Sequence, residues 1–129
     1  MPLTMGDNQS VDYFISATDD LGMKTTRLGA GQTVAVTSSD TTTVSITPDT
    51  TVRNAPDGSP SVASGKAASV VSSAGGTLNT PVTISAAVSN ADGTPGTDDK
   101  GVAIAPATDT ITVQAGLAHA IGELFGVPA

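Results

Sequence analysis

Apolar side chains recur at every second position along much of this sequence. In residues 9–17, for example, Val11, Tyr13 and Ile15 occupy alternate positions. A repeat of two residues places one set of side chains on a single face of a β-strand. The same pattern predicts strands over residues 23–28, 32–37, 43–47, 81–88 and 109–114. Residues 62–73 are less regular, and we expect a strand there around Val70 and Val71.

Residues that favour turns separate these segments. Residues 19–22 (Asp-Asp-Leu-Gly) and 90–93 (Asn-Ala-Asp-Gly) are typical turn sequences, and residues 48–60 and 94–101 predict two exposed loops. This gives about seven to eight short antiparallel strands, without the intervening helices that a parallel sheet needs. The pattern predicts an all-β fold, an immunoglobulin-like β-sandwich with a short C-terminal helical or extended tail.

Apolar residues with helical spacing occur only in that tail. Leu117, Ile121, Leu124 and Phe125 fall on one helical face. We therefore divide the chain into a domain over residues 1–116, which begins with a short N-terminal arm, and an apolar tail over residues 117–129. Either the tail covers an edge or an open end of its own domain, or it binds a partner protein. The same two alternatives apply to the arm, with Pro2, Leu3 and Met5 as its partner-binding residues.

Composition and charge narrow the possible partners. The net charge is −7 and the five cationic residues are dispersed singly, which argues against binding to nucleic acid or to anionic membranes. Aromatic residues make up only 2% of the chain, so the core is expected to consist of Val, Ile, Leu and Ala. Cysteine is absent, which excludes disulfides and thiolate metal sites. The first residues lack the pattern of a signal peptide, and we expect synthesis in the cytoplasm.

No group of residues predicts catalysis. His119 is the only histidine and lies in the tail without a recognisable carboxylate or nucleophile beside it. Asn90, Asp92, Asp98 and Asp99 could supply oxygen ligands to calcium, but their spacing is not that of an EF-hand and the segment is also a good turn. We favour the turn interpretation. The expectation is a protein that is not an enzyme and has no cofactor or metal.

Several short segments together resemble a known family. They are residues 1–11 (Met-Pro-Leu-Thr-Met-Gly-Asp-Asn-Gln-Ser-Val), the turn at 19–22, Ser38-Ser39-Asp40 before Val44-Ser45-Ile46, and Ile111-Thr112-Val113. Over roughly residues 1–115 the chain resembles bacterial immunoglobulin-like (BIg-type) domain proteins of tailed phages and prophages. Members of this family decorate capsids or form modules on tails. The chain departs from the family in lacking a bulky aromatic residue near the second pair of strands.

The resemblance implies a structural virion protein. We expect a phage capsid decoration protein that binds the assembled shell in many copies or as a homo-oligomer. Its partner would be the major capsid protein or another virion protein, and its location the virion. The alternative is an immunoglobulin-like adhesion module on a tail or cell surface that recognises a receptor or a glycan through the loops at residues 54–60 and 92–101. Those loops contain no aromatic residue to stack on a sugar, so this alternative ranks second.

Overall fold

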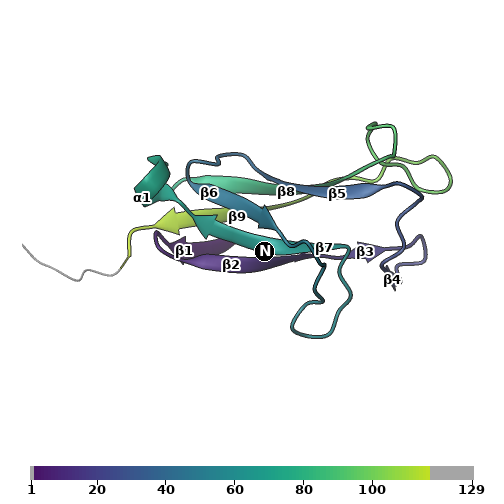
Figure 1. Ribbon diagram of the computed structural model, residues 1–129, viewed down its shortest axis with the longest axis horizontal. Coiled ribbons are helices and arrows are strands. Elements are labelled where there is room, and N and C mark those ends of the chain that lie inside the picture. The colour runs from purple at the N-terminus through teal and green to yellow at the C-terminus, as the bar shows by residue number, and fades with distance from the viewer. Residues whose placement is uncertain (1, 117–129) are drawn as a thin grey trace, which may run out of the picture.

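A computed structural model describes residues 2–116 of the chain, and these form an all-β fold (Figure 1). The elements in chain order are β1 (Leu3–Gly6), β2 (Ser10–Ile15), β3 (Ala17–Thr18), β4 (Lys24–Thr25), β5 (Thr33–Ser38), β6 (Val44–Pro48), β7 (Ala63–Ser69), α1 (Val71–Ala74), β8 (Pro81–Ser89) and β9 (Ala107–Gln114). The all-β prediction is confirmed. Within the described residues, no helix is long and apolar enough to span a membrane.

The strands form two main sheets and a small hairpin. One sheet has the order β1-β9-β8-β5, the other has the order β2-β7-β6, and β3 pairs with β4. Neighbouring strands are antiparallel, except that β1 runs parallel to β9, with Met5 opposite Val113. The predicted antiparallel strands did not include residues 3–6, which were interpreted as an N-terminal arm. The strand β1 and its parallel pairing with β9 therefore correct the predicted fold.

The core lies between the two main sheets. Its buried members come from both sheets: Met5, Val82, Ile111 and Val113 from one, and Val44 and Ala67 from the other. Tyr13 lies directly opposite Gly65, and a Cβ atom added at Gly65 would collide with the tyrosine hydroxyl and with the carbonyl oxygen of Thr47. Small residues in β7 therefore leave room for the one tyrosine, and they explain why this strand lacks a clear alternating pattern.

Two sequence predictions need local correction. The strand predicted over residues 23–28 shrinks to Lys24–Thr25. Neither Val70 nor Val71 lies in a strand, because β7 ends at Ser69 and Val71 begins the single-turn helix α1. The backbone of Gly75 adopts a left-handed conformation (φ 74°), and its N–H donates to the carbonyl oxygen of Val71 at 3.0 Å. The left-handed glycine ends the turn and directs the chain toward β8.

A polar turn carries the chain from one main sheet to the other. Between β5 and β6, Asp40 accepts hydrogen bonds from the backbone N–H of Thr42 at 3.0 Å and from the hydroxyl of Thr43 at 2.6 Å. The Thr43 side chain is fully buried, and its oxygen also accepts the N–H of Thr77 at 2.9 Å. Hydrogen bonds from the hydroxyls of Thr42 and Thr43 lower the pKa of Asp40. The charged carboxylate is thus part of the folded turn.

Candidate functional site

The space between the sheets is filled at one end and open at the other. The core occupies the end near β1, β6 and α1, whereas a cleft of about 1190 Å³ lies at the opposite end. The cleft is bounded by β5 and β8 on one side, by the β3–β4 hairpin on another, and by the loops between β8 and β9. We call this end, which carries residues 17–34 and 87–107, the turn end; it is on the right in Figure 1.

Apolar side chains that continue the inner faces of the sheets line this cleft. Val34 and Val88 are direct cross-strand partners on β5 and β8, and both line it. Ile15, at the end of β2, and Val62, just before β7, also line it, and the N–H of Val62 donates to the carbonyl oxygen of Ile15 at 2.8 Å. All four side chains are only partly buried. The alternating pattern thus continues past the core and lines an open cleft.

Two turns of the same sequence type stand beside the cleft. Residues 19–23 read Asp-Asp-Leu-Gly-Met and residues 98–102 read Asp-Asp-Lys-Gly-Val. In each turn the first aspartate accepts backbone hydrogen bonds at 2.9 Å from the residues two and four positions later. The glycines have φ of 79° and 78°, which favours residues without a side chain. We call residues 19–23 and 98–102 the twin turns.

The twin turns display apolar side chains to solvent. Leu21 is 83% exposed, Met23 64% and Val102 60%, and Ile104 follows at 37%. These four are the majority of the large exposed apolar residues in the described part of the chain. The ion pair between Lys100 Nζ and Asp20 Oδ2, at 2.9 Å, joins one turn to the other across the two sides of the cleft. Clustered exposed apolar residues are typical of protein–protein binding surfaces.

A cluster of hydrogen bonds holds the loop at residues 90–97, which also belongs to the turn end. The side-chain nitrogen of Gln32 donates to Asn90 Oδ1 at 2.9 Å and to the carbonyl oxygen of Thr97 at 2.7 Å. Asp92 accepts the N–H and the hydroxyl of Thr94 at 3.0 and 2.6 Å, and the hydroxyl hydrogen bond lowers its pKa. Together with Asp98 in the second twin turn, these contacts confirm the turn interpretation of the acidic segment. Among residues 2–116 no cluster of His, Asp or Glu could hold a metal ion.

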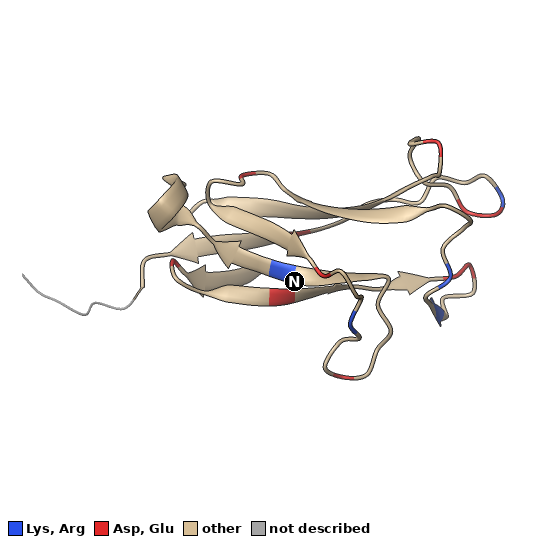
Figure 2. Ribbon diagram, viewed as in Figure 1, with Lys and Arg blue, Asp and Glu red and all other residues tan. Residues whose placement is uncertain are grey.

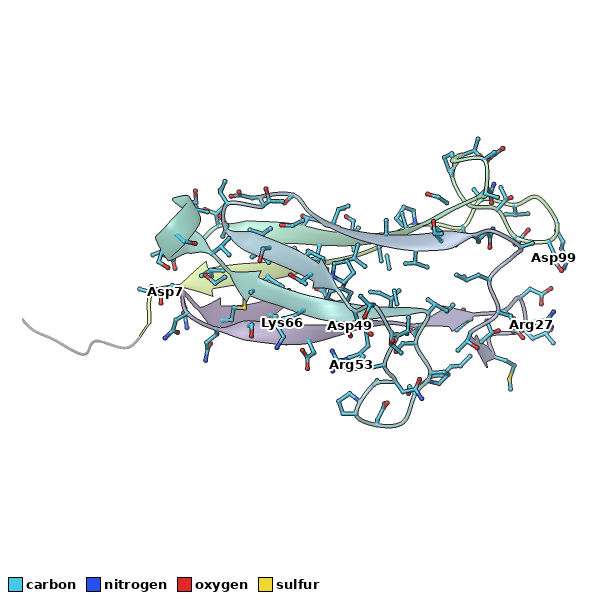
Figure 3. All side chains as sticks on the ribbon, viewed as in Figure 1. Asp7, Arg27, Asp49, Arg53, Lys66 and Asp99 are labelled. Carbon is cyan, nitrogen blue, oxygen red and sulfur yellow. The ribbon has the colours of Figure 1, made fainter. Side chains whose placement is uncertain are left out.

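The loops of the turn end carry charges of both signs (Figure 2). Five aspartates line the cleft, at positions 19, 20, 92, 98 and 99, together with Lys24 and Arg27. In Figure 3, Asp99 and Arg27 lie on the loops at opposite sides of the turn end. The site therefore combines an apolar wall with a charged and mainly acidic surround, which suits a partner that inserts apolar side chains and presents polar groups around them.

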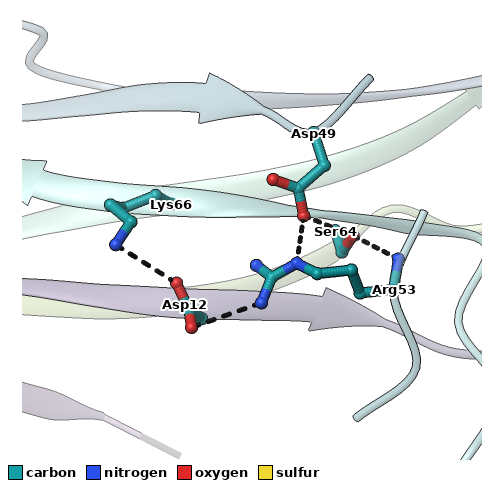
Figure 4. A network of polar contacts seen from close by, with 5 residues as sticks. All are labelled: Asp12, Asp49, Arg53, Ser64 and Lys66. Carbon is teal, nitrogen blue, oxygen red and sulfur yellow. Dashed lines mark hydrogen bonds and ion pairs between the residues drawn. The ribbon is translucent and has the colours of Figure 1, made fainter. Parts of the chain in front are cut away.

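A second polar cluster lies on the outer face of the β2-β7-β6 sheet (Figure 4). Arg53 Nε is 2.7 Å from Asp49 Oδ2, and an Arg53 terminal nitrogen is 3.5 Å from Asp12, which also pairs with Lys66 at 3.6 Å. The Ser64 hydroxyl donates to Asp49 at 2.8 Å, and the hydrogen bond from Arg53 lowers the pKa of Asp49. Two cations balance two carboxylates, so the cluster fastens the loop before β7 to the sheet.

The predicted partner-binding residues fall into three groups. Met5 is 5% exposed and belongs to the domain's own core, so the arm follows the alternative in which it packs against its own domain. Pro2 is exposed and Leu3 is 37% exposed on the edge strand β1. The tail positions, together with His119, lie outside the described residues: Leu117, Ile121, Leu124 and Phe125.

The relation between the twin turns was not predicted from the sequence. Residues 19–22 were interpreted as a turn, and residues 98–101 were assigned to the loop that the adhesion alternative uses. The signal was nevertheless present, because both share the order Asp-Asp-x-Gly followed by an apolar residue. Leu21, Met23 and Val102 are also unusual in turns, where polar residues predominate.

The comparisons with known proteins add no relative. Neither a protein-family model, nor a curated protein, nor a solved structure matches the chain.

Proposed function

We propose that this chain is an immunoglobulin-like β-sandwich that acts as a structural protein by binding other protein surfaces at its turn end. The strand order supports the fold. When β2, β5, β6, β7, β8 and β9 are lettered B to G, one sheet is B-E-D and the other contains C-F-G, as in immunoglobulin domains. The β3–β4 hairpin is then an addition between strands B and C, and β1 adds to the free side of strand G.

The exposed apolar side chains of the twin turns carry the proposal. Leaving Leu21, Met23 and Val102 in water is unfavourable, at about 1.5–3 kcal/mol for each side chain that a partner could fully bury. The turns that carry them are held by aspartate hydrogen bonds and by the Lys100–Asp20 ion pair. The twin turns would therefore lose little conformational entropy when a partner binds, and surfaces that are already ordered bind more tightly.

The setting that we propose is a virus particle, with the chain as a capsid decoration protein. The resemblance to phage immunoglobulin-like proteins supports this setting. Binding only to the assembled shell would stabilise the shell by linkage. Since β1 is paired and Met5 is buried, we place the contact with the shell at the turn end rather than at an N-terminal arm.

Particles of the phage or prophage that carries the gene provide the test. Peptide mass spectrometry of purified particles should detect many copies of this chain per particle. Recombinant full-length chain should also co-sediment with particles from a strain that lacks the gene. The double variant Leu21→Asp/Val102→Asp should weaken this binding at least tenfold.

The control is Val52→Asp, which places one aspartate, against two in the double variant, at an exposed valine (46% exposed) outside the turn end. This control should bind like the unaltered chain. Absence of the chain from purified particles would refute the virion setting. Equal binding by the turn variant and the control would refute the turn end as the contact surface.

The adhesion alternative has one supporting observation. Asn90, Gln32, Thr97 and several aspartates place hydrogen-bonding groups beside the cleft, as a glycan site requires. None of the residues lining the cleft is aromatic, so a sugar ring would find no stacking surface there. Binding of the full-length chain to a glycan array, lost on Leu21→Asp/Val102→Asp, would favour this alternative over capsid decoration.

A further inference from the structure

The cleft at the turn end, which both apolar and polar side chains line, has the size of a binding site for a chain segment. Its volume of about 1190 Å³ exceeds that of most sites for small molecules. Val34, Val88, Ile15 and Val62 line it, and none of them is fully buried. Such a groove suits an apolar segment that enters with several side chains.

The chain carries such a segment in residues 117–129. Their sequence, Leu-Ala-His-Ala-Ile-Gly-Glu-Leu-Phe-Gly-Val-Pro-Ala, contains one acidic residue and no lysine or arginine. Leu117, Ile121, Leu124 and Phe125 recur every one to four positions. Fully extended, thirteen residues span about 43–47 Å, and as a helix about 20 Å. Either form offers several apolar side chains within the length of a small domain.

The position of the chain end favours the cleft of another copy over the copy's own cleft. The first residue of β9, Ala107, lines the cleft, whereas the chain leaves β9 at Gln114 at the opposite end of the molecule (Figure 1). The eight residues of β9 span about 26 Å. To return to its own cleft, the segment would use about eight residues, and Leu117 and Ile121 would lie along the return path. In the cleft of a second copy, all four apolar side chains are free to enter.

We propose that residues 117–129 of one copy bind in the turn-end cleft of another copy. Because donor and acceptor are at opposite ends of the molecule, the contact is head-to-tail and produces rings or open chains of copies. The proposal rests on the proposed function in one respect only, namely that the chain acts by binding other protein molecules. It is testable on the purified protein without any virus particle.

Two complementary variants test it. Ile121→Asp/Leu124→Asp/Phe125→Asp removes the donor and leaves the cleft unchanged. Ala105→Arg blocks the acceptor, because Ala105 is an exposed residue that lines the cleft, and a larger side chain there displaces no buried group. Ala74→Arg is the matched control, since Ala74 is an exposed alanine in α1, outside the cleft. Circular dichroism should show that all the variants retain the β fold.

Sedimentation velocity over a hundredfold range of concentration is the measurement. The unaltered full-length chain and Ala74→Arg should form species larger than a dimer, and each of the other two variants alone should remain monomeric. An equimolar mixture of these two variants should form a one-to-one complex, since it contains one intact donor and one intact cleft. A monomeric unaltered chain, or a mixture that gives no complex, would overturn the proposal. Assembly of Ala105→Arg as strong as that of the control would also overturn it, by placing the contact elsewhere. Failure of particle binding would leave these results unchanged.

Discussion

Two valine-to-alanine substitutions, one in the core and one at the turn end, test whether the two ends of the molecule are packed differently. Val113 is 0% exposed and packs in the core, whereas Val34 is partly exposed and lines the cleft. Both lie on strands of the same sheet, β9 and β5. The chemistry removed, two methyl groups, is therefore the same, and only the surroundings differ.

The expected losses follow from these surroundings. Removing two methyl groups from a packed site costs about 1.6 kcal/mol in transfer free energy, and the cavity left behind raises the cost at Val113 to about 2–3 kcal/mol. At Val34 the substitution only widens an open cleft, so the cavity contribution is absent and the expected loss is about 1 kcal/mol or less.

Urea unfolding followed by far-ultraviolet circular dichroism at one protein concentration measures both losses. The chain has no tryptophan, so backbone ellipticity is the suitable signal. Val113→Ala should lower the free energy of unfolding at least twice as much as Val34→Ala. Equal losses would show that the turn end is packed as tightly as the core, and the cleft would no longer be available to a partner.

Three further substitutions test local features of the fold. Gly65→Ala should destabilise the protein by about 1–3 kcal/mol in the same urea assay, because the new Cβ collides with the Tyr13 hydroxyl; unchanged stability would contradict this packing. Hydrogen bonds lower the pKa of Asp40 in the folded state below its usual value of 3.8, so its stabilising effect is complete above that value and is lost as the pH falls through the lowered pKa. Asp40→Asn should therefore lose less stability than the unaltered chain when the pH is lowered from about 5 to about 2, that is, from above the usual pKa to below it. An equal loss of stability in the two proteins would contradict the assignment. Lys100→Ala breaks the exposed ion pair with Asp20 and should change the free energy of unfolding by less than about 1 kcal/mol, whereas a larger, salt-independent loss would show that the pair does more than orient the twin turns.

The strands were predictable where a single face is buried. Pro81–Ser89 and Ala107–Gln114 emerge from alternation alone because their inner side chains, such as Val82 and Ile111, meet the core. The pattern failed in Ala63–Ser69, where the small residue Gly65 accommodates Tyr13 from the neighbouring strand. The spacing of apolar residues within one segment does not reveal that a small residue on one strand makes room for a large residue on the neighbouring strand.

The turn end was harder to predict from sequence, for a physical reason. Alternation marks Val34 and Val88 as inward-facing, but not whether another sheet covers them. That depends on where the β3–β4 hairpin and the loops after β8 lie, which is set by contacts distant in sequence, such as Gln32 with Thr97. The choice between the two alternatives for the arm stayed open for the same reason, because Met5 becomes a core residue only once β1 pairs with β9.

Hydrogen exchange of the full-length chain at low and high protein concentration tests the central claim most directly. If the turn end is the binding surface, raising the concentration should slow the exchange of amides in residues 17–34 and 87–107 and leave those of β6 and β7 unchanged. Slower exchange confined to β6 and β7, or no change at the turn end under conditions in which the chain assembles, would contradict the account.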